Sequence, residues 1–186
     1  MRIVGGRFKG RVLASPTSYD VRPTSDRLRE SLFNILAHAY GAPGEDARVL
    51  DLFAGTGALG LEAVSRGARF AAFVDDGAEA RGLIRANIDA LGLAGATRVL
   101  RRDATKLGPA GPFEPFTLVF CDPPYRHGLA ERALVAARDG GWLRPEALVV
   151  VEEAAEAGFV PPDGFTELDR RPYGESEIAI LQRANG

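Results

Sequence analysis

The residues Asp122-Pro123-Pro124-Tyr125 end an apolar run at positions 116–121 and could hold a planar amine. Proline fixes φ and has no backbone N–H, and a residue before proline prefers an extended conformation. The tetrad therefore predicts a stiff turn, in which the Asp122 carboxylate and the Pro123 carbonyl each accept one N–H of an amine while Tyr125 stacks on the attached ring. An ordinary turn after a strand uses the same residue types, so the assignment depends on the rest of the chain.

Three glycines, Gly55, Gly57 and Gly60, follow a second apolar run at positions 49–52. They match the Gly-x-Gly-x-x-Gly pattern of dinucleotide sites, in which the missing side chains let the backbone approach a ligand closely. Asp75 ends another apolar run twenty residues after Gly55, and a carboxylate there can accept both hydroxyls of a ribose. The pattern fits either NAD or S-adenosylmethionine.

A carboxylate that precedes the glycines, Asp51, separates these two cofactors. The pyrophosphate of NAD needs the positive N-terminus of a helix, and an anion four residues before Gly55 would repel it. The same anion could hold the ammonium group of a methionine moiety, although a helix-capping or solvated acid is an alternative. Asp103 could accept the adenine amine, and a solvated loop carboxylate is the competing interpretation. The residues favour S-adenosylmethionine.

These residues need a parallel sheet to bring them together. The apolar patterns predict strands and helices in alternation. The strands are expected at 48–52, 70–75, 97–101, 116–121 and 147–152. The helices are expected at 58–66, 78–91 and 129–138, after a first helix that is capped within Thr24-Ser25-Asp26 and runs to about Tyr40. Continuous apolar strands alternating with helices indicate an α/β fold with helices on both faces of the sheet.

The last part of the chain predicts a hairpin of residues 165–170 and 177–183, which adds an antiparallel edge. We therefore expect a doubly wound, mostly parallel seven-stranded sheet. In such sheets ligands bind outside the carboxyl ends of the strands. Four acids fall at four such ends: Asp51, Asp75, Asp103 and Asp122. Glu152 ends a fifth strand, where a solvated acid is slightly favoured over a residue of the substrate pocket.

The first thirty residues are basic, with seven Arg or Lys and three acids, whereas the remainder holds 16 basic and 22 acidic residues. Such a distribution favours phosphate binding at one end of the molecule. Glycines between apolar residues predict a β-hairpin arm at 1–23, followed by a domain at 24–186, with a solvated tail as the alternative. Arg7, Lys9 and Arg11 are the expected nucleic-acid ligands.

The composition excludes several classes of protein. A single cysteine, Cys121, excludes a disulfide framework. Because the chain has only two histidines, His38 and His127, no metal cluster is expected. Cys121 is interpreted as a small buried hydrophobe and not as a nucleophile. No run of about twenty apolar residues and no N-terminal secretion signal is present, so we expect a cytoplasmic protein without a membrane span.

Together, the glycine pattern, Asp75, Asp103 and the tetrad resemble the motifs of class I S-adenosylmethionine-dependent amino-methyltransferases. The block Arg22–Leu36 is similar to the RsmD family of bacterial methyltransferases. The resemblance implies a Rossmann-like fold and methyl transfer to the N2 amine of a guanine in small-subunit (16S) ribosomal RNA. It also implies that the partner is a protein-bound 30S particle.

Other functions share parts of this pattern. Adenine-N6 and protein-glutamine methyltransferases use the same tetrad, and only the basic arm and the Arg22–Leu36 block favour guanine in RNA. An NAD-dependent oxidoreductase would need a hydride-transfer acid–base pair, which is not evident. A non-catalytic RNA-binding module with a vestigial cofactor pocket is disfavoured by the intact tetrad.

Overall fold

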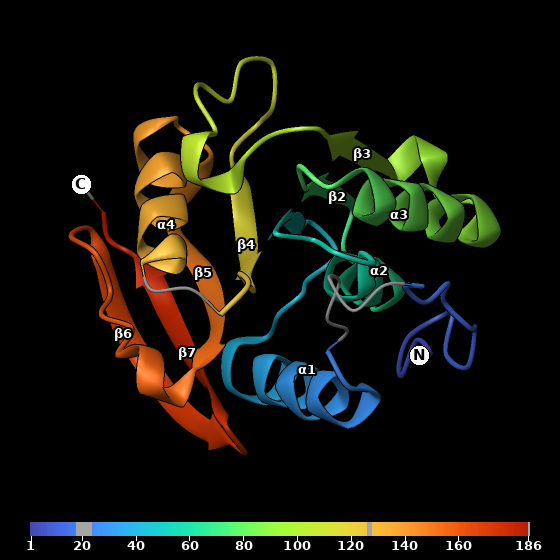
Figure 1. Cartoon of the computed structure of the whole chain (residues 1–186), viewed down its shortest axis with the longest axis horizontal. Coiled ribbons are helices and arrows are strands. Elements are labelled where there is room, and N and C mark those ends of the chain that lie inside the picture. Colours follow the sequence, from blue (N-terminus) through green and yellow to red (C-terminus); the bar gives the residue numbers. More distant parts are fainter. Residues whose placement is uncertain (18–23, 126–127, 186) are drawn as a thin grey trace.

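A seven-stranded sheet runs through the computed structural model, which describes residues 1–17, 24–125 and 128–185 (Figure 1). The strands are β1 (Arg48–Leu52), β2 (Phe70–Val74), β3 (Thr97–Leu100), β4 (Phe116–Cys121), β5 (Leu143–Ala154), β6 (Phe165–Tyr173) and β7 (Ser176–Arg183). The helices are α1 (Asp26–Tyr40), α2 (Ala58–Ser65), α3 (Ala78–Leu91) and α4 (Leu129–Asp139), and three short 3₁₀ turns, η1 (Ala94–Ala96), η2 (Ala104–Lys106) and η3 (Ala155–Ala157), join them. The predicted order of elements is confirmed.

The sheet is mixed, with the strand order β3-β2-β1-β4-β5-β7-β6. The first five strands pair in parallel, whereas β7 pairs antiparallel with both β5 and β6. The part from β1 to β5 is parallel, as predicted, whereas the last two strands are antiparallel and make the whole sheet mixed. β7 is inserted between β5 and β6, so β6 forms the edge.

Local sequence signals set the ends of several elements. The Ser25 hydroxyl accepts the Leu28 N–H and caps α1, and Gly41 ends this helix in a left-handed conformation with φ +62°. β5 is longer than the predicted 147–152, because it pairs from Leu143 beside β4 to Ala154 beside Ser176 of β7.

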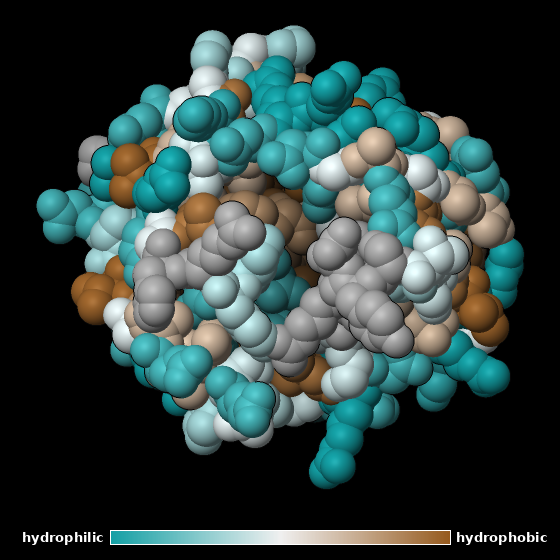
Figure 2. Space-filling model, in the orientation of Figure 1, coloured by the Kyte–Doolittle hydropathy of each residue, from teal (hydrophilic) through white to brown (hydrophobic). Residues whose placement is uncertain are grey.

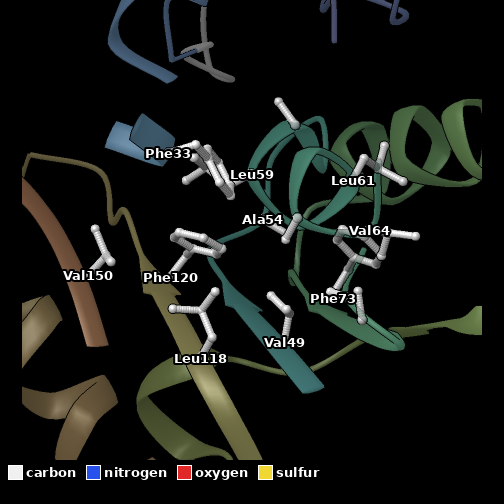
Figure 3. Packing of buried hydrophobic residues seen from close by; sticks show 14 of the residues in the cluster. Phe33, Val49, Ala54, Leu59, Leu61, Val64, Phe73, Leu118, Phe120 and Val150 are labelled. Carbon is white, nitrogen blue, oxygen red and sulfur yellow. The ribbon is translucent and has the colours of Figure 1, made fainter. Parts of the chain in front are cut away.

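Two hydrophobic clusters cover the two faces of the sheet. On one face α1, α2 and α3 pack on β1, β2 and β4, and the rings of Phe33 and Phe120 lie 5.6 Å apart (Figure 3). On the other face α4 packs around Trp142, which stacks on Phe116 at a centroid distance of 6.1 Å. The predicted coverage of both faces is confirmed.

Residues 1–13 form a loop that turns back on itself and lies against α2. A single antiparallel bridge joins Arg2 to Val12, so the predicted hairpin is correct in its reversal but wrong in its strands. Three hydrogen bonds join the loop to Ser65: the Arg7 N–H donates to the Ser65 carbonyl at 2.9 Å, the Phe8 N–H donates to the Ser65 hydroxyl at 3.0 Å, and this hydroxyl donates to the Gly5 carbonyl at 2.6 Å. The predicted boundary at residue 23 and Arg22 lie outside the described residues.

Candidate active site

Two cavities open at the carboxyl ends of the strands, and they share Thr24 and Asp122. The glycine-loop cavity has a volume of about 560 Å³, and its lining includes Asp51, Gly55, Asp75, Asp122 and Tyr125. The Glu152 cavity has a volume of about 470 Å³, and its lining includes Leu28, Ser31, Asp122, Glu152 and Tyr173. Figure 2 shows the face toward the viewer of Figure 1, which is hollowed near its centre.

The structure brings most of the predicted site residues to the glycine-loop cavity. Asp51, Gly55 and Asp75 line it together with all four residues of the tetrad, Asp122, Pro123, Pro124 and Tyr125. Gly57, Gly60 and Asp103 are not among its lining residues. Seven residues that come from three segments of the chain therefore meet at one cavity.

Gly57 and Gly60 shape the start of α2. Gly57 adopts φ +79°, a left-handed conformation that favours glycine, and Gly60 faces the ring of Phe73, 2.5 Å from where a Cβ would lie. Asp103 has a local partner: its carboxylate accepts the N–H and the hydroxyl of Thr105, at 2.8 and 2.7 Å. These hydrogen bonds, above all, lower the pKa of Asp103. Its predicted contact with an adenine amine stays a prediction.

Asp51 lies inside β1 with only 1% of its surface exposed. Its Oδ2 accepts the N–H of Gly60 at 3.0 Å, in the first turn of α2. Burial raises the pKa of Asp51 to about 8; the Gly60 hydrogen bond opposes this rise and the charge of Asp75 adds to it. The cavity wall therefore holds an acid whose ionised form would be stabilised by a bound cation.

Asp75 follows β2 and positions two loops. Its Oδ2 accepts the N–H of Gly55 at 3.0 Å, and its Oδ1 accepts the N–H of Gly77 at 2.8 Å. Burial raises the pKa of this carboxyl, and the two backbone hydrogen bonds oppose the rise. The carboxylate thus holds the glycine turn beside the cavity, where its remaining lone pairs can accept hydroxyl groups.

The tetrad follows β4 directly. The Thr24 hydroxyl donates to Oδ2 of Asp122 at 3.2 Å, Pro123 is buried, and Tyr125 is 44% exposed at the mouth of the cavity. Cys121 lies behind them in the core, where burial raises the pKa of its thiol well above the usual range. Its predicted role as a buried hydrophobe is confirmed.

Glu152 requires a correction. It is 9% exposed and lines a cavity together with Asp122, so the interpretation as a solvated acid at a strand end was wrong. The sequence analysis also missed Thr24, Ser31 and Tyr173. Thr24 was predicted only as part of the helix cap, which the structure assigns to Ser25. Ser31 and Tyr173 are 142 residues apart in sequence, and their hydroxyls lie 2.9 Å apart.

The predicted RNA ligands Arg7, Lys9 and Arg11 are exposed. They belong to the loop that contacts Ser65 at the end of α2, and an eight-residue helix of about 12 Å separates this end from the glycine turn. Arg11 also donates to the Ala90 carbonyl at 2.6 Å. The basic residues are therefore placed on a surface outside the two cavities.

Among the described residues, no group of three His, Cys, Asp or Glu side chains is placed to hold a metal ion; His127 lies outside these residues. No helix in the described ranges is long and apolar enough to cross a membrane.

The chain is similar to several known proteins. A family model described as "Conserved hypothetical protein 95" matches residues 1–182. The chain is 46% identical to "Ribosomal RNA small subunit methyltransferase D" of Escherichia coli (strain K12), with 98% of this chain and 90% of the relative covered. The Haemophilus influenzae protein of the same name is 32% identical, with 98% and 93% covered.

Solved structures share the fold over nearly the whole length. The structure of yhhF from Escherichia coli has a TM-score of 0.83 at 37% identity and covers 99% of this chain and 98% of its own. The structure of HI0767 from Haemophilus influenzae has a TM-score of 0.80 at 30% identity, with the same coverage. The sheet and both cavity walls thus lie within the shared length.

Proposed function

The chain belongs to the RsmD family, the family described as conserved hypothetical protein 95, and from this we propose that it methylates the N2 amine of a guanine in small-subunit ribosomal RNA. The methyl donor is S-adenosylmethionine. One observation carries the proposal: the tetrad that can hold an amine and the acids that can hold the donor line one cavity. Donor and acceptor can therefore react without leaving it.

The residues present fit a cationic adenosyl ligand, which supplies an electrophilic methyl group when bound. Asp51 would hold its ammonium group, because a bound cation offsets the cost of ionising this buried acid. Asp75 would accept the ribose hydroxyls beside Gly55. NAD fits less well, since the Gly60 N–H at the start of α2 already donates to Asp51 and an acid stands where a pyrophosphate would bind.

Asp122 and Pro123 would hold the amine at the edge of the cavity. An aromatic amine is a weak nucleophile because its lone pair is delocalised into the ring. The Asp122 carboxylate and the Pro123 carbonyl would accept its two N–H bonds and aim the lone pair at the methyl carbon, so that positioning supplies much of the rate. As the C–N bond forms and the C–S bond breaks, one amine proton leaves to Asp122, which the Thr24 hydroxyl orients. Tyr125 would stack on a base turned out of its RNA loop.

The test is incubation with labelled S-adenosylmethionine and unmethylated small ribosomal subunits, followed by nucleoside analysis. The expected product is N2-methylguanosine in the RNA. N6-methyladenosine, or label in protein glutamine, would replace the proposal by one of the other reactions that use the same tetrad. Naked RNA is assayed in parallel, because we propose the protein-bound 30S particle, in the cytoplasm, as the partner.

Binding of S-adenosylhomocysteine at the donor site should release a proton from Asp51. Below about pH 8 the free protein holds Asp51 protonated, whereas a bound ammonium favours the carboxylate, so the proton leaves on binding. Affinity for S-adenosylhomocysteine should therefore rise between pH 6.0 and 7.5, by up to about tenfold per pH unit. Calorimetry in two buffers of different ionisation enthalpy measures the released proton.

Asp51→Asn is the matched control, because the amide keeps the volume and does not titrate. This variant should bind more weakly and with no proton release. A wild-type affinity that is flat across this range, without proton release, would place the ammonium group elsewhere.

The exposed basic residues of the loop are proposed to bind RNA phosphates, and the division into an arm of residues 1–23 and a domain of residues 24–186 is part of this proposal. Replacing Arg7, Lys9 and Arg11 by Gln should weaken RNA binding and reduce the slope of log affinity against log salt by roughly 2–3. S-adenosylhomocysteine affinity should not change. Filter binding across a salt series gives the slope.

A second triple variant, with Arg98, Arg101 and Lys106 changed to Gln, removes the same charge from exposed positions beside β3. It should leave the slope close to that of the wild type. Equal effects of the two triple variants would show that net charge, and not the loop, determines RNA affinity.

A further inference from the structure

The Glu152 cavity lies directly beside the proposed reaction centre. It shares Asp122 and Thr24 with the glycine-loop cavity, and its volume of about 470 Å³ is in the range of small-molecule sites. Leu28 contributes an apolar wall, whereas Ser31 and Tyr173 contribute hydroxyl groups. A base whose amine is held by Asp122 therefore has room for its ring in this cavity.

The sheet places Glu152 and Asp122 at matching positions. Cys121 of β4 is paired in parallel with Val151 of β5, so the next residues, Asp122 and Glu152, lie side by side at two adjacent strands. Neighbouring strands are about 4.8 Å apart. Two carboxylates at this spacing can accept hydrogen bonds from two adjacent N–H donors on one edge of a flat ring.

We propose that Glu152 determines the choice of base: the Glu152 cavity holds the guanine ring, and the Glu152 carboxylate accepts its N1–H while Asp122 accepts the N2 amine. This proposal rests on the proposed function of the site. In guanine the amine at C2 stands next to N1–H, which is a donor. In adenine the amine at C6 stands next to N1 with a lone pair, which a carboxylate repels, and a glutamine amide has no ring N–H at all.

Two hydroxyl groups that line the cavity suit the remaining edge of guanine. The hydroxyls of Ser31 and Tyr173 are 2.9 Å apart, and because one hydrogen makes their mutual bond, the pair has a second O–H to donate. Guanine O6, next to N1, is an acceptor. The cavity thus offers an acceptor for N1–H and a donor for O6.

The discriminating probe is 2-aminopurine, placed in small-subunit RNA at the guanine that the wild-type protein methylates. It keeps the amine at C2 but carries a lone pair on N1 and lacks O6, so the change of the rate ratio in Glu152→Gln isolates the N1 contact. The wild-type protein should methylate it at least about 100-fold more slowly than guanine, since sites built for a hydrogen bond reject analogues that lack the donor. Glu152→Gln should slow guanine methylation about 10- to 100-fold. It should also reduce the ratio of the methylation rate on guanine to that on 2-aminopurine about tenfold or more, because the glutamine amide can donate to N1 of 2-aminopurine.

Two further measurements complete the test. Glu175→Gln makes the same chemical change at an exposed residue of the β6–β7 turn and should leave rate and ratio unchanged. S-adenosylhomocysteine binding by Glu152→Gln, equal to that of the wild type, shows that the variant is folded.

Outcomes for the inference and for the proposed function differ. Absence of N2-methylguanosine with the wild-type protein contradicts the proposed function. Formation of N2-methylguanosine by the wild type together with equal rates on guanine and 2-aminopurine contradicts only the role of Glu152, and this result does not depend on the folding of any variant. An unchanged ratio of the rates on guanine and 2-aminopurine in Glu152→Gln also contradicts the role of Glu152.

Discussion

Replacing Asp122 with alanine is expected to reduce kcat on small ribosomal subunits by about 10²- to 10⁴-fold, while affinity for S-adenosylhomocysteine stays within about twofold of the wild-type value. The range is that of a side chain which positions a reacting group and accepts its proton. Asp122 borders both cavities and accepts the Thr24 hydroxyl. Its proposed partner is the amine of the base, so the donor site should keep its affinity.

Asp75→Ala is the matched control, because it removes the same functional group from the other side of the glycine-loop cavity. Its affinity for S-adenosylhomocysteine should fall about 10- to 100-fold through lost charge-assisted hydrogen bonds, with a smaller effect on kcat at saturating donor. Calorimetry and single-turnover methylation separate the two variants. Equal losses of affinity in both would assign Asp122 to the donor site.

The second large effect concerns stability. Arg29→Met is expected to lower the free energy of unfolding by about 3–5 kcal/mol, the usual cost of removing one partner of a buried ion pair. The side chains of Arg29 and Glu62 are both 0% exposed, and their Nη1 and Oε2 atoms are 3.1 Å apart. Arg29 also pairs with Asp26 and donates to the Arg2 carbonyl at 2.8 Å.

Burial lowers the pKa of Arg29, and the carboxylates of Glu62 and Asp26 oppose this change, so the guanidinium depends on its partners. Urea unfolding measures the effect. Arg27→Met, at an exposed position two residues earlier in α1, should change the free energy of unfolding by no more than about 0.5 kcal/mol. If Arg29→Met unfolds at the same urea concentration as Arg27→Met, the buried pair does not hold α1 and α2 together.

The sequence predicted the strands well because most of the parallel strands are short apolar runs with an acid at or near the carboxyl end. The positions of Asp51, Asp75 and Asp122 follow from this pattern alone, since carboxyl ends of parallel strands share one edge. Asp103 obeys the same pattern but has a local partner in Thr105. A strand-end acid that faces a cavity and one that caps a turn look identical in sequence.

Long-range contacts explain what the sequence did not predict. Arg29 looks like one more base of a basic segment, and only its contact with Glu62, 33 residues later, shows that it is buried and structural. Glu152 resembles any acid at a strand end until β7 pairs with β5 and covers it. The loop of residues 1–13 holds its own turns through backbone hydrogen bonds, such as that from the Ile3 N–H to the Arg11 carbonyl at 3.0 Å. Its position against α2 depends on contacts with Ser65, which could not be inferred from the residues of the loop alone.

The insertion of β7 between β5 and β6 has a consequence for the protein during its synthesis. β6 is made before β7, yet its neighbour in the sheet is β7 and not β5. At ribosomal rates of roughly 5–20 residues per second, β5 and β6 both wait with unpaired backbone groups until residues 176–183 have left the exit tunnel. Nascent or prematurely terminated chains that lack this segment present two open strand edges, which can template aggregation.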